Sequence, residues 1–147
     1  MKDTQAILRH AVFAVLNGQL SYNSVNVPVY DEKRKAGATD NLFVILGTQQ
    51  ESDDDTSDAF ITDSSIDIEI QHRTAFEVSK DAIDEVGNQI LQILMPTPQT
   101  DGFQVQNLFL ITCVRRSSTI SRNFSLTDSN SIVAKIITIT CKIVQQS

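Results

Sequence analysis

The chain is poor in the side chains that most often build catalytic and metal sites. Its 147 residues contain no tryptophan, five glycines, two cysteines and two histidines. His10 and His72 have neither a cysteine nor a second histidine at ligand spacing, which argues against metal ligation by either one. Cys113 and Cys141 lie within apolar, β-branched runs, so we expect two small buried hydrophobic side chains rather than a disulfide or a ligand pair.

Long hydrophobic runs and clustered positive charge are also missing. No apolar run approaches the roughly 18 to 20 residues that cross a bilayer. Asp3, Arg9 and His10 interrupt the stretch where the core of a signal peptide would lie, so we expect neither a membrane span nor secretion. The net charge of −6 argues against nonspecific binding to the phosphates of nucleic acids, and any contact with DNA should be weak or repulsive.

Glycine-rich phosphate loops and glycine elbows around a nucleophile are absent as well. The serines between Ser117 and Ser121 have no flanking glycine and no base placed beside them, so they favour a polar loop. The carboxylates, histidines and serines form no recognisable constellation. We therefore expect no catalytic residue, no cofactor and no enzymatic activity.

Two stretches repeat their apolar residues at intervals of three and four, as amphipathic helices do. The first runs from Thr4 to Leu16 and is followed by Gly18, which can take the left-handed conformation that closes a helix. The core face of the second runs from Ala82 to Leu94, and Pro96 stops it. The pattern predicts two helices, each with one buried face.

Other stretches have the composition and alternation of strands. Ile66, Ile68 and Ile70 alternate with polar residues, which predicts a half-buried strand. Gly47 is expected to end a compact apolar strand, and a polar break is expected from Arg115 to Asn123. The predicted strands are Val25–Tyr30, an edge strand because of Pro28, then Leu42–Leu46, Phe60–Arg73, Phe103–Val114 and Ile132–Val144.

The order of these elements predicts a fold of the α+β class. A chain of this length matches one domain, and we find no internal repeat, so residues 1–147 are expected to form a single unit. Two helices and about five strands most simply give one mixed or antiparallel sheet with both helices packed on one face, a two-layer sandwich.

The densest charge lies between two predicted strands, where five acidic residues fall within eight positions: Glu51, Asp53, Asp54, Asp55 and Asp58. An EF-hand loop requires a central glycine and flanking helices, and this stretch has neither. Adjacent aspartates also point in divergent directions, so they do not converge on one cation. The pattern favours a solvated hairpin tip over a metal site.

Arginines form a cluster of the opposite sign, with Arg115, Arg116 and Arg122 expected at the turn between the last two strands. Such a cluster is more often a solvated loop than a binding site. Together with the acidic stretch it nevertheless divides the surface into patches of opposite charge.

The order of elements resembles that of the tail completion, or tail terminator, proteins of tailed bacteriophages. The resemblance covers nearly the whole chain: a first helix ending in LNG, the strand VNVPVYDE, a charged link, the strand LFVILG, a polar hairpin, alternating isoleucines, the helix EVSKDAIDEVGNQILQIL and two final strands. Its most specific pieces are VPVYDE and LFVILG, and neither carries a catalytic residue. The long acidic loop and the extended Thr-rich last strand depart from the usual pattern.

What the resemblance implies is a structural protein of the head–tail junction. Copies would form a ring, commonly sixfold or twelvefold, around the channel through which DNA leaves the capsid, in contact with portal, connector or tail proteins. The chain would then be found in the virion, and in the bacterial host cytoplasm during assembly. In such a ring, Glu51, Asp53, Asp54, Asp55 and Asp58 would either face Arg115, Arg116 and Arg122 of a neighbour or line the channel.

The residues also leave a second class open. A small α+β module that binds a ligand or a metal, without catalytic activity, fits the same pattern of elements. It would require a convergent polar pocket, and the sequence shows none.

Overall fold

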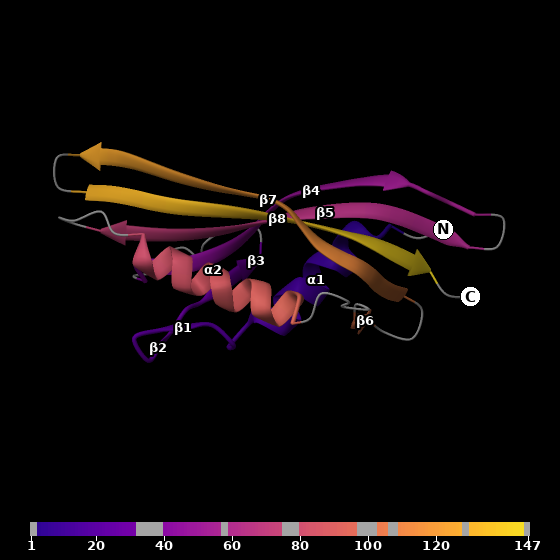
Figure 1. The fold of residues 1–147 in the computed structure, drawn as a ribbon, viewed down its shortest axis with the longest axis horizontal. Helices are drawn as coiled ribbons and strands as arrows, with labels where there is room; N and C mark the ends of the chain where they lie inside the picture. Colours follow the sequence, from indigo (N-terminus) through magenta and orange to yellow (C-terminus); the bar gives the residue numbers. More distant parts are fainter. Residues whose placement is uncertain are drawn as a thin grey trace.

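One twisted sheet, covered by helices on a single face, makes up most of the part of the chain described by the computed structural model (Figure 1). The description covers residues 3–31, 40–56, 59–74, 80–96, 103–105, 109–127 and 130–145. The helices are α1 (Gln5–Leu16) and α2 (Asp81–Leu94). The strands are β1 (Ser21–Tyr22), β2 (Val25–Asn26), β3 (Val29–Asp31), β4 (Leu42–Asp53), β5 (Phe60–Thr74), β6 (Phe103–Val105), β7 (Phe109–Thr127) and β8 (Asn130–Gln145).

The sheet has six strands in the order β3-β4-β5-β8-β7-β6. Strands β3 and β4 pair in parallel, and the other neighbours are antiparallel. Strands β1 and β2 form a separate hairpin. The predicted α+β class, with a mixed sheet and two helices on one face, is confirmed, and the sheet has one strand more than expected because the fourth predicted strand divides into β6 and β7.

Helix α1 begins and ends where the sequence indicates. The side chain of Asp3 accepts a hydrogen bond of 3.0 Å from the amide of Gln5, which satisfies one first-turn donor. Beyond the last turn Gly18 has φ of 79°, a conformation that costs glycine least. Neither described helix is long and apolar enough to span a membrane.

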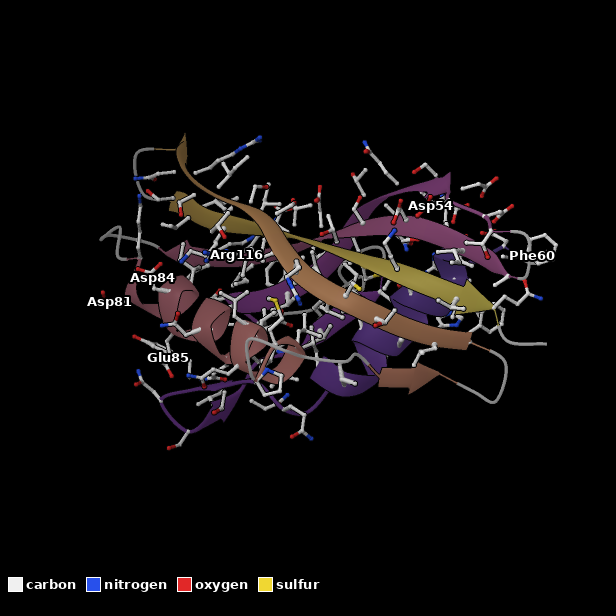
Figure 2. All side chains as sticks on the ribbon, turned by 45° about the vertical axis from the view of Figure 1, so that its right-hand side comes forward. Asp54, Phe60, Asp81, Asp84, Glu85 and Arg116 are labelled. Carbon is white, nitrogen blue, oxygen red and sulfur yellow. The ribbon has the colours of Figure 1, made fainter. Side chains whose placement is uncertain are left out.

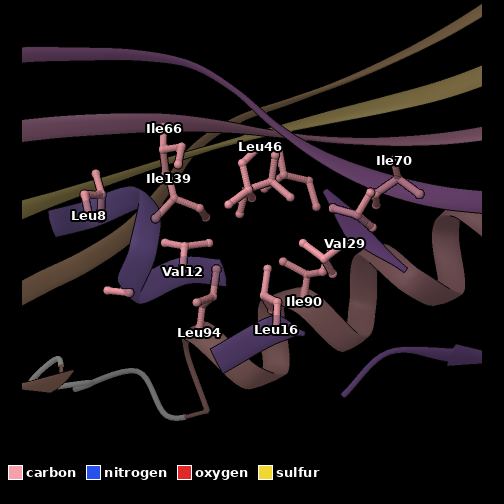
Figure 3. Packing of buried hydrophobic residues seen from close by; sticks show 14 of the residues in the cluster. Leu8, Val12, Leu16, Val29, Leu46, Ile66, Ile70, Ile90, Leu94 and Ile139 are labelled. Carbon is pink, nitrogen blue, oxygen red and sulfur yellow. The ribbon is translucent and has the colours of Figure 1, made fainter. Parts of the chain in front are cut away.

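The main core lies between the sheet and the two helices (Figure 3). Alternate residues of β5 point toward the helices, so Ile66, Ile68 and Ile70 are fully buried there. Helix α2 contributes Ile83, Val86, Ile90 and Leu94, at the spacing of one helical face. These residues meet Leu8, Val12 and Leu16 of α1, and the fold therefore rests on two amphipathic helices and one face of the sheet.

A smaller cluster covers part of the opposite face of the sheet. Phe43 is buried completely there, with the ring of Tyr30 edge-on at 6.0 Å and the guanidinium of Arg73 at 5.5 Å from its ring centroid. Its neighbour Val44 is buried on the helix side. Strand β4 is therefore buried on both faces at Phe43 and Val44.

Strand β4 does not end at Gly47 as expected. Its pairing with β5 shifts between Leu46 and Gln49 and then continues to Asp53. A bulge of this kind lets a strand absorb extra residues and continue with a stronger twist. Glycine therefore marks an irregularity within the strand rather than its end.

The expected break from Arg115 to Asn123 is also wrong, because these residues form the middle of β7. They pair with β8 in register from Arg115 opposite Thr140 to Asn123 opposite Val133. Their side chains are exposed on both faces of the strand. A strand that buries neither face needs no apolar alternation, and hydrophobic pattern alone gives no sign of it.

Candidate functional site

Only part of the acidic stretch lies at the tip of the β4–β5 hairpin: Asp54 and Asp55 do, whereas Glu51 and Asp53 belong to the end of β4. Asp53 pairs with Thr62 at the end of the ladder. Beyond it the amide of Asp54 donates to the carbonyl of Ile61 at 2.7 Å, and the Asp55 carboxylate accepts from the amide of Ile61 at 3.1 Å. Asp58 lies outside the described residues. The tip is thus a hydrogen-bonded turn, and one of its carboxylates serves the turn itself.

Two other carboxylates tie the hairpin to the rest of the fold. Glu51 accepts a hydrogen bond of 2.7 Å from the hydroxyl of Thr4, next to the first turn of α1. Asp54 lies 2.7 Å from the ammonium of Lys142 on β8. The side chain of Asp53, by contrast, is exposed and makes no hydrogen bond or ion pair with another described residue. The four described acids therefore have different roles, and Asp53 is the one among them most available to a partner.

Lys142 joins the hairpin tip to the outer face of the sheet. Its ammonium also lies 2.8 Å from the carboxylate of Asp63 on β5. Hydrogen bonds to Asp54 and then to Asp63 raise the pKa of Lys142. Lys142 therefore stays charged and pairs with two carboxylates at this end of the molecule, offsetting one of their two negative charges.

A shallow depression of about 400 Å³ lies beside this ion-pair cluster. It is lined by Gln50, Glu51, Ser52, Asp63, Ser64, Ser65, Cys113, Thr140, Cys141 and Lys142. Its charged groups are already occupied, since Asp63 pairs with Lys142 and Glu51 with Thr4. Nothing in this lining presents a free acid and base side by side, so its geometry favours no catalytic chemistry.

The two cysteines have different environments. Cys141 is buried, and burial, with smaller effects of Asp63 and Cys113, raises the pKa of its thiol to about 12. Cys113 is exposed on β7, where it has φ of 55° at a shift in the β7–β8 register. The expectation of a small buried side chain is confirmed for Cys141 and is wrong for Cys113, because the irregular backbone turns that residue outward.

The arginines lie along β7 and not at a turn. Arg115 is opposite Thr140, Arg116 opposite Ile139, and Arg122 opposite Ala134. Arg116 lines a hollow with Asn88, Leu91, Gln92 and Met95 of the α2 region, so it faces the helix side. Arg115, which aligns with the outward-facing Thr140, lies on the outer face. The expected single basic patch is therefore divided between two faces of one strand.

Within one chain the structure does not bring the acidic tip and the arginines together. Asp53 aligns across β5 with Ile143 of β8, whereas Arg122 aligns with Ala134. Nine residues of strand separate Asp53 from Arg122, about 30 Å at roughly 3.3 Å per residue. Arg116 aligns with Gln49 and is separated from the acids of β4 mainly by the three strand spacings across the sheet. Figure 2 shows Asp54 and Phe60 at one end of the molecule, away from Arg116.

Among the described residues, no group of three or more histidine, cysteine, aspartate or glutamate side chains could hold a metal ion. His10 is exposed on α1. His72 is half-buried, and loss of hydration lowers its pKa.

No protein-family model matches the chain, and no curated protein matches it either. Solved structures do match. One is a chain in the virion of a native gene transfer agent (GTA) particle, with a TM-score of 0.63 and 10% sequence identity. The two chains share a fold.

The alignment covers 90% of this chain and 84% of the GTA virion chain, so it includes both layers rather than one motif. At such low identity the similarity establishes the fold alone. The match to the GTA virion chain therefore supports the fold described above and does not by itself assign a function.

Sequence reasoning missed one further feature, which is that both sides of the sheet have long edges along which no described strand pairs. Reading Arg115–Asn123 as a break concealed the edge of β7, and reading Gly47 as a strand end concealed the edge of β4. The sequence signal for β7 was the alternation of hydroxyl residues with isoleucine and arginine from Thr119 to Arg122.

Proposed function

We propose that this protein is a structural component of the virion of a tailed bacteriophage, and that its copies form a ring at the head–tail junction around the DNA channel. The observation that carries the proposal is the match over most of both chains to a chain of the GTA virion. The resemblance of the sequence to tail completion and tail terminator proteins agrees with it. Contacts with portal, connector or tail proteins follow from the same position.

The distribution of charge supports assembly into a closed ring. A ring uses a heterologous interface, in which one patch of each subunit meets a different patch on its neighbour. Asp53 and Arg122 lie near opposite ends of the sheet and do not meet within one chain, so Asp53 of one copy can meet an arginine of the next. Unlike charges across such a contact favour the correct orientation.

A second role fits the acidic tip if it lies at the inner wall of the ring. Negative charge there would keep DNA phosphates from adhering, since phosphate binding depends on lysine and arginine. The overall charge of −6 agrees with a wall that lets DNA pass.

Size-exclusion chromatography with light scattering, followed by negative-stain imaging, tests the ring. The purified protein is expected to form rings of one defined copy number, alone or on addition of the neighbouring virion proteins. A protein that stays monomeric under both conditions overturns the proposal. Thermal unfolding with and without calcium tests the ligand- or metal-binding alternative, because a monomer stabilised by calcium would favour that class.

The role of the tip is tested by Asp53→Lys, because Asp54 and Asp55 already have partners within the chain. Weaker ring assembly would place Asp53 at a subunit contact, and normal rings with slower DNA ejection would place it at the channel. Glu85→Lys is the matched control, since Glu85 is an exposed acid on α2 at the other end of the molecule (Figure 2). If Asp53→Lys behaves like this control in both assays, the tip has neither role.

A further inference from the structure

We propose that the β-sheet continues from one copy to the next, with the open edge of β7 pairing with the open edge of β4 of a neighbouring copy. The inference rests on the proposed ring and specifies its subunit contact. It follows from the extent, the charge and the alignment of the two edges.

The open edge of β7 is long. Strand β6 covers β7 only where Phe103–Val105 pair with Phe109–Ile111. From Thr112 to Thr127, no strand in the described part of the chain pairs with the side of β7 that faces away from β8. The side of β7 that faces β8 stays paired as far as Thr127. An exposed edge of this length offers a row of backbone donors and acceptors to another strand.

The opposite side of the sheet has a second open edge. Strand β3 pairs with β4 only from Val44 to Leu46. From Gly47 to Asp53, no described strand lies on that side of β4, and the side chains of this segment are mostly exposed. On each side of the sheet, one strand thus has a segment that no described strand covers: Gly47–Asp53 of β4 and Thr112–Thr127 of β7.

Charge favours pairing between unlike edges. The β7 edge from Thr112 to Asn123 carries three arginines and no acid, whereas the β4 edge from Gly47 to Asp53 carries Glu51 and Asp53 and no base. Two β7 edges, or two β4 edges, would place like charges opposite one another, which destabilises a ladder. Pairing β7 with β4 brings opposite charges together and gives the head-to-tail contact that a ring requires.

The directions of the two strands agree with this contact. Strands β4, β5, β8 and β7 are antiparallel in succession, so β7 runs opposite to β4. A second copy shifted sideways across the sheet therefore presents its β4 antiparallel to β7 of the first. No inversion of the second copy is needed.

Residues paired side by side across the strands form rows, and these rows place the open segments of β4 and β7 at the same level of the sheet. Gln49 shares a row with Ile66, Ile139 and Arg116, and Ser52 shares a row with Asp63, Lys142 and Thr112. A neighbour placed without a shift along the strands would bring Gln49–Ser52 beside Thr112–Arg116. Arg116 would then lie diagonal to Glu51 on the helix side of the sheet, within reach of a long side chain.

Irregularities on the two edges coincide. The β4 ladder shifts between Leu46 and Gln49, and the β7 ladder shifts between Arg116 and Ser118. Both shifts lie between the row of Ile137 and the row of Ile139 on β8. Two edges that bend at the same row can follow each other. The other shift of β7, between Thr112 and Arg115, has no counterpart in β4, where Gln50–Ser52 pair regularly with β5, so the contact must carry a bulge at Cys113.

A disulfide experiment tests the contact with a native thiol. Cys113 is exposed on β7 between Thr112 and Arg115, so Ser52→Cys on β4 of the neighbour would lie beside it. Within one chain the two positions are three strand spacings apart, about 14 Å, which is too far for a disulfide. Mild oxidation of assembled Ser52→Cys is expected to join most chains into covalent oligomers on non-reducing gels.

Matched variants separate this contact from random collisions. Ser52→Cys combined with Cys113→Ser, and Gln92→Cys on the exposed side of α2, are expected to give no covalent oligomers. Gln50→Cys and Thr48→Cys extend the scan along the same edge, so a pairing shifted along the strands is also detected.

The outcomes distinguish the two proposals. Rings that form in every variant but cross-link at none of the three β4 positions would overturn the edge contact and leave the proposed ring intact. Cross-linked open chains without rings would support the edge contact and overturn the ring. A protein that neither oligomerises nor cross-links overturns both.

Discussion

Gly87 determines how closely helix α2 approaches the sheet. A Cβ at this position would lie 3.2 Å from Cδ of Lys135 and 3.6 Å from Cδ1 of both Ile137 and Ile70. Glycine within a helix usually costs about 0.5 to 1 kcal/mol relative to alanine, so close packing accounts for its use here. A larger side chain must push the helix away from β5 and β8.

We expect Gly87→Leu to lower the free energy of unfolding by about 1 to 3 kcal/mol, because overpacking forces side chains and backbone apart. Urea unfolding followed by circular dichroism measures the change. Asn88→Leu is the control, since Asn88 is exposed on the same helix and should change stability far less. Equal effects of the two variants would contradict the close approach at Gly87.

Thiol reactivity should separate the two cysteines. The thiolate is the reactive form, and burial of Cys141 raises its pKa to about 12, whereas Cys113 is exposed. We expect one thiol per folded chain to react rapidly with Ellman's reagent, and the second to react only after denaturation. Cys113→Ser should abolish the rapid phase. Two rapid thiols in the folded protein would show that Cys141 is accessible.

His72 should make stability depend on pH. Its pKa in the folded chain is lowered from 6.5 by loss of hydration, so the unfolded chain binds this proton more readily. Stability contributed by neutral His72 is therefore retained above the unfolded pKa and decreases as the pH falls below it. Between about pH 7.5 and 5.5, the thermal midpoint of His72→Gln is expected to fall less than that of the wild type. An identical fall in both proteins would exclude His72 as a source.

Among the elements, α1 is held to β4 by polar contacts as well as by its apolar face. The Thr4 hydroxyl donates to Glu51, and the side-chain amide of Gln49 donates to the carbonyl of Gln5 at 2.9 Å. Thr4 is almost fully buried, so its hydroxyl depends on this acceptor. The acidic hairpin is therefore fixed at its base, whatever its tip contacts.

We expect Thr4→Val to lower the free energy of unfolding by about 0.5 to 1.5 kcal/mol, the usual net value of one hydrogen bond. Glu51→Gln keeps an acceptor for Thr4 and should cost less. Chemical unfolding of the two variants measures the difference. A larger loss for Glu51→Gln than for Thr4→Val would show that the charge of Glu51, and not this bond, stabilises the hairpin.

The elements that bury one face could be predicted, and those that bury none could not. Ile66, Ile68 and Ile70 alternate because β5 lies between the helices and solvent, and that alternation marks the strand in the sequence. Arg115–Asn123 have no such constraint, since their pairing with β8 depends on backbone groups. The parallel β3–β4 pair and the strand order also require contacts that no local pattern encodes.

The candidate site was predictable in part for the same reason. A hairpin follows from charge between two apolar strands and is present, but β4 continues to Asp53, so the tip begins later than predicted. The ion pairs of Lys142 with Asp54 and Asp63 join residues far apart in the sequence and depend on the β5–β8 register. The prediction that the arginines lie at a turn was wrong, because β7 continues through them to Thr127 and the turn to β8 comes after that residue.

At the scale of the whole molecule, the sheet has a basic side and an acidic side, and assembly should respond to salt. The Debye length falls from about 10 Å at 0.1 M to about 3 Å at 1 M ionic strength, so attraction between exposed charges is screened. We expect the mean mass measured by light scattering to decrease as sodium chloride is raised over this range.

Arg116→Gln removes one charge from the β7 edge and should make the mass less sensitive to salt. Arg9→Gln provides a comparison with the same loss of charge on α1, where Arg9 pairs with Asp31 at 2.8 Å within the chain. Assembly that strengthens with salt would indicate an apolar contact instead of the charged edges.

The position of β8 in the middle of the sheet has a consequence for synthesis on the ribosome. Phe60 of β5 pairs with Gln145 and Thr74 with Ser131, so β5 has a partner on only one side until nearly all of the described chain has been made. The nascent chain must keep Ile66, Ile68 and Ile70 from associating with other chains during that interval. Correct folding therefore depends on the last strand to emerge, and slow translation before β8 would prolong the period in which the nascent chain can aggregate.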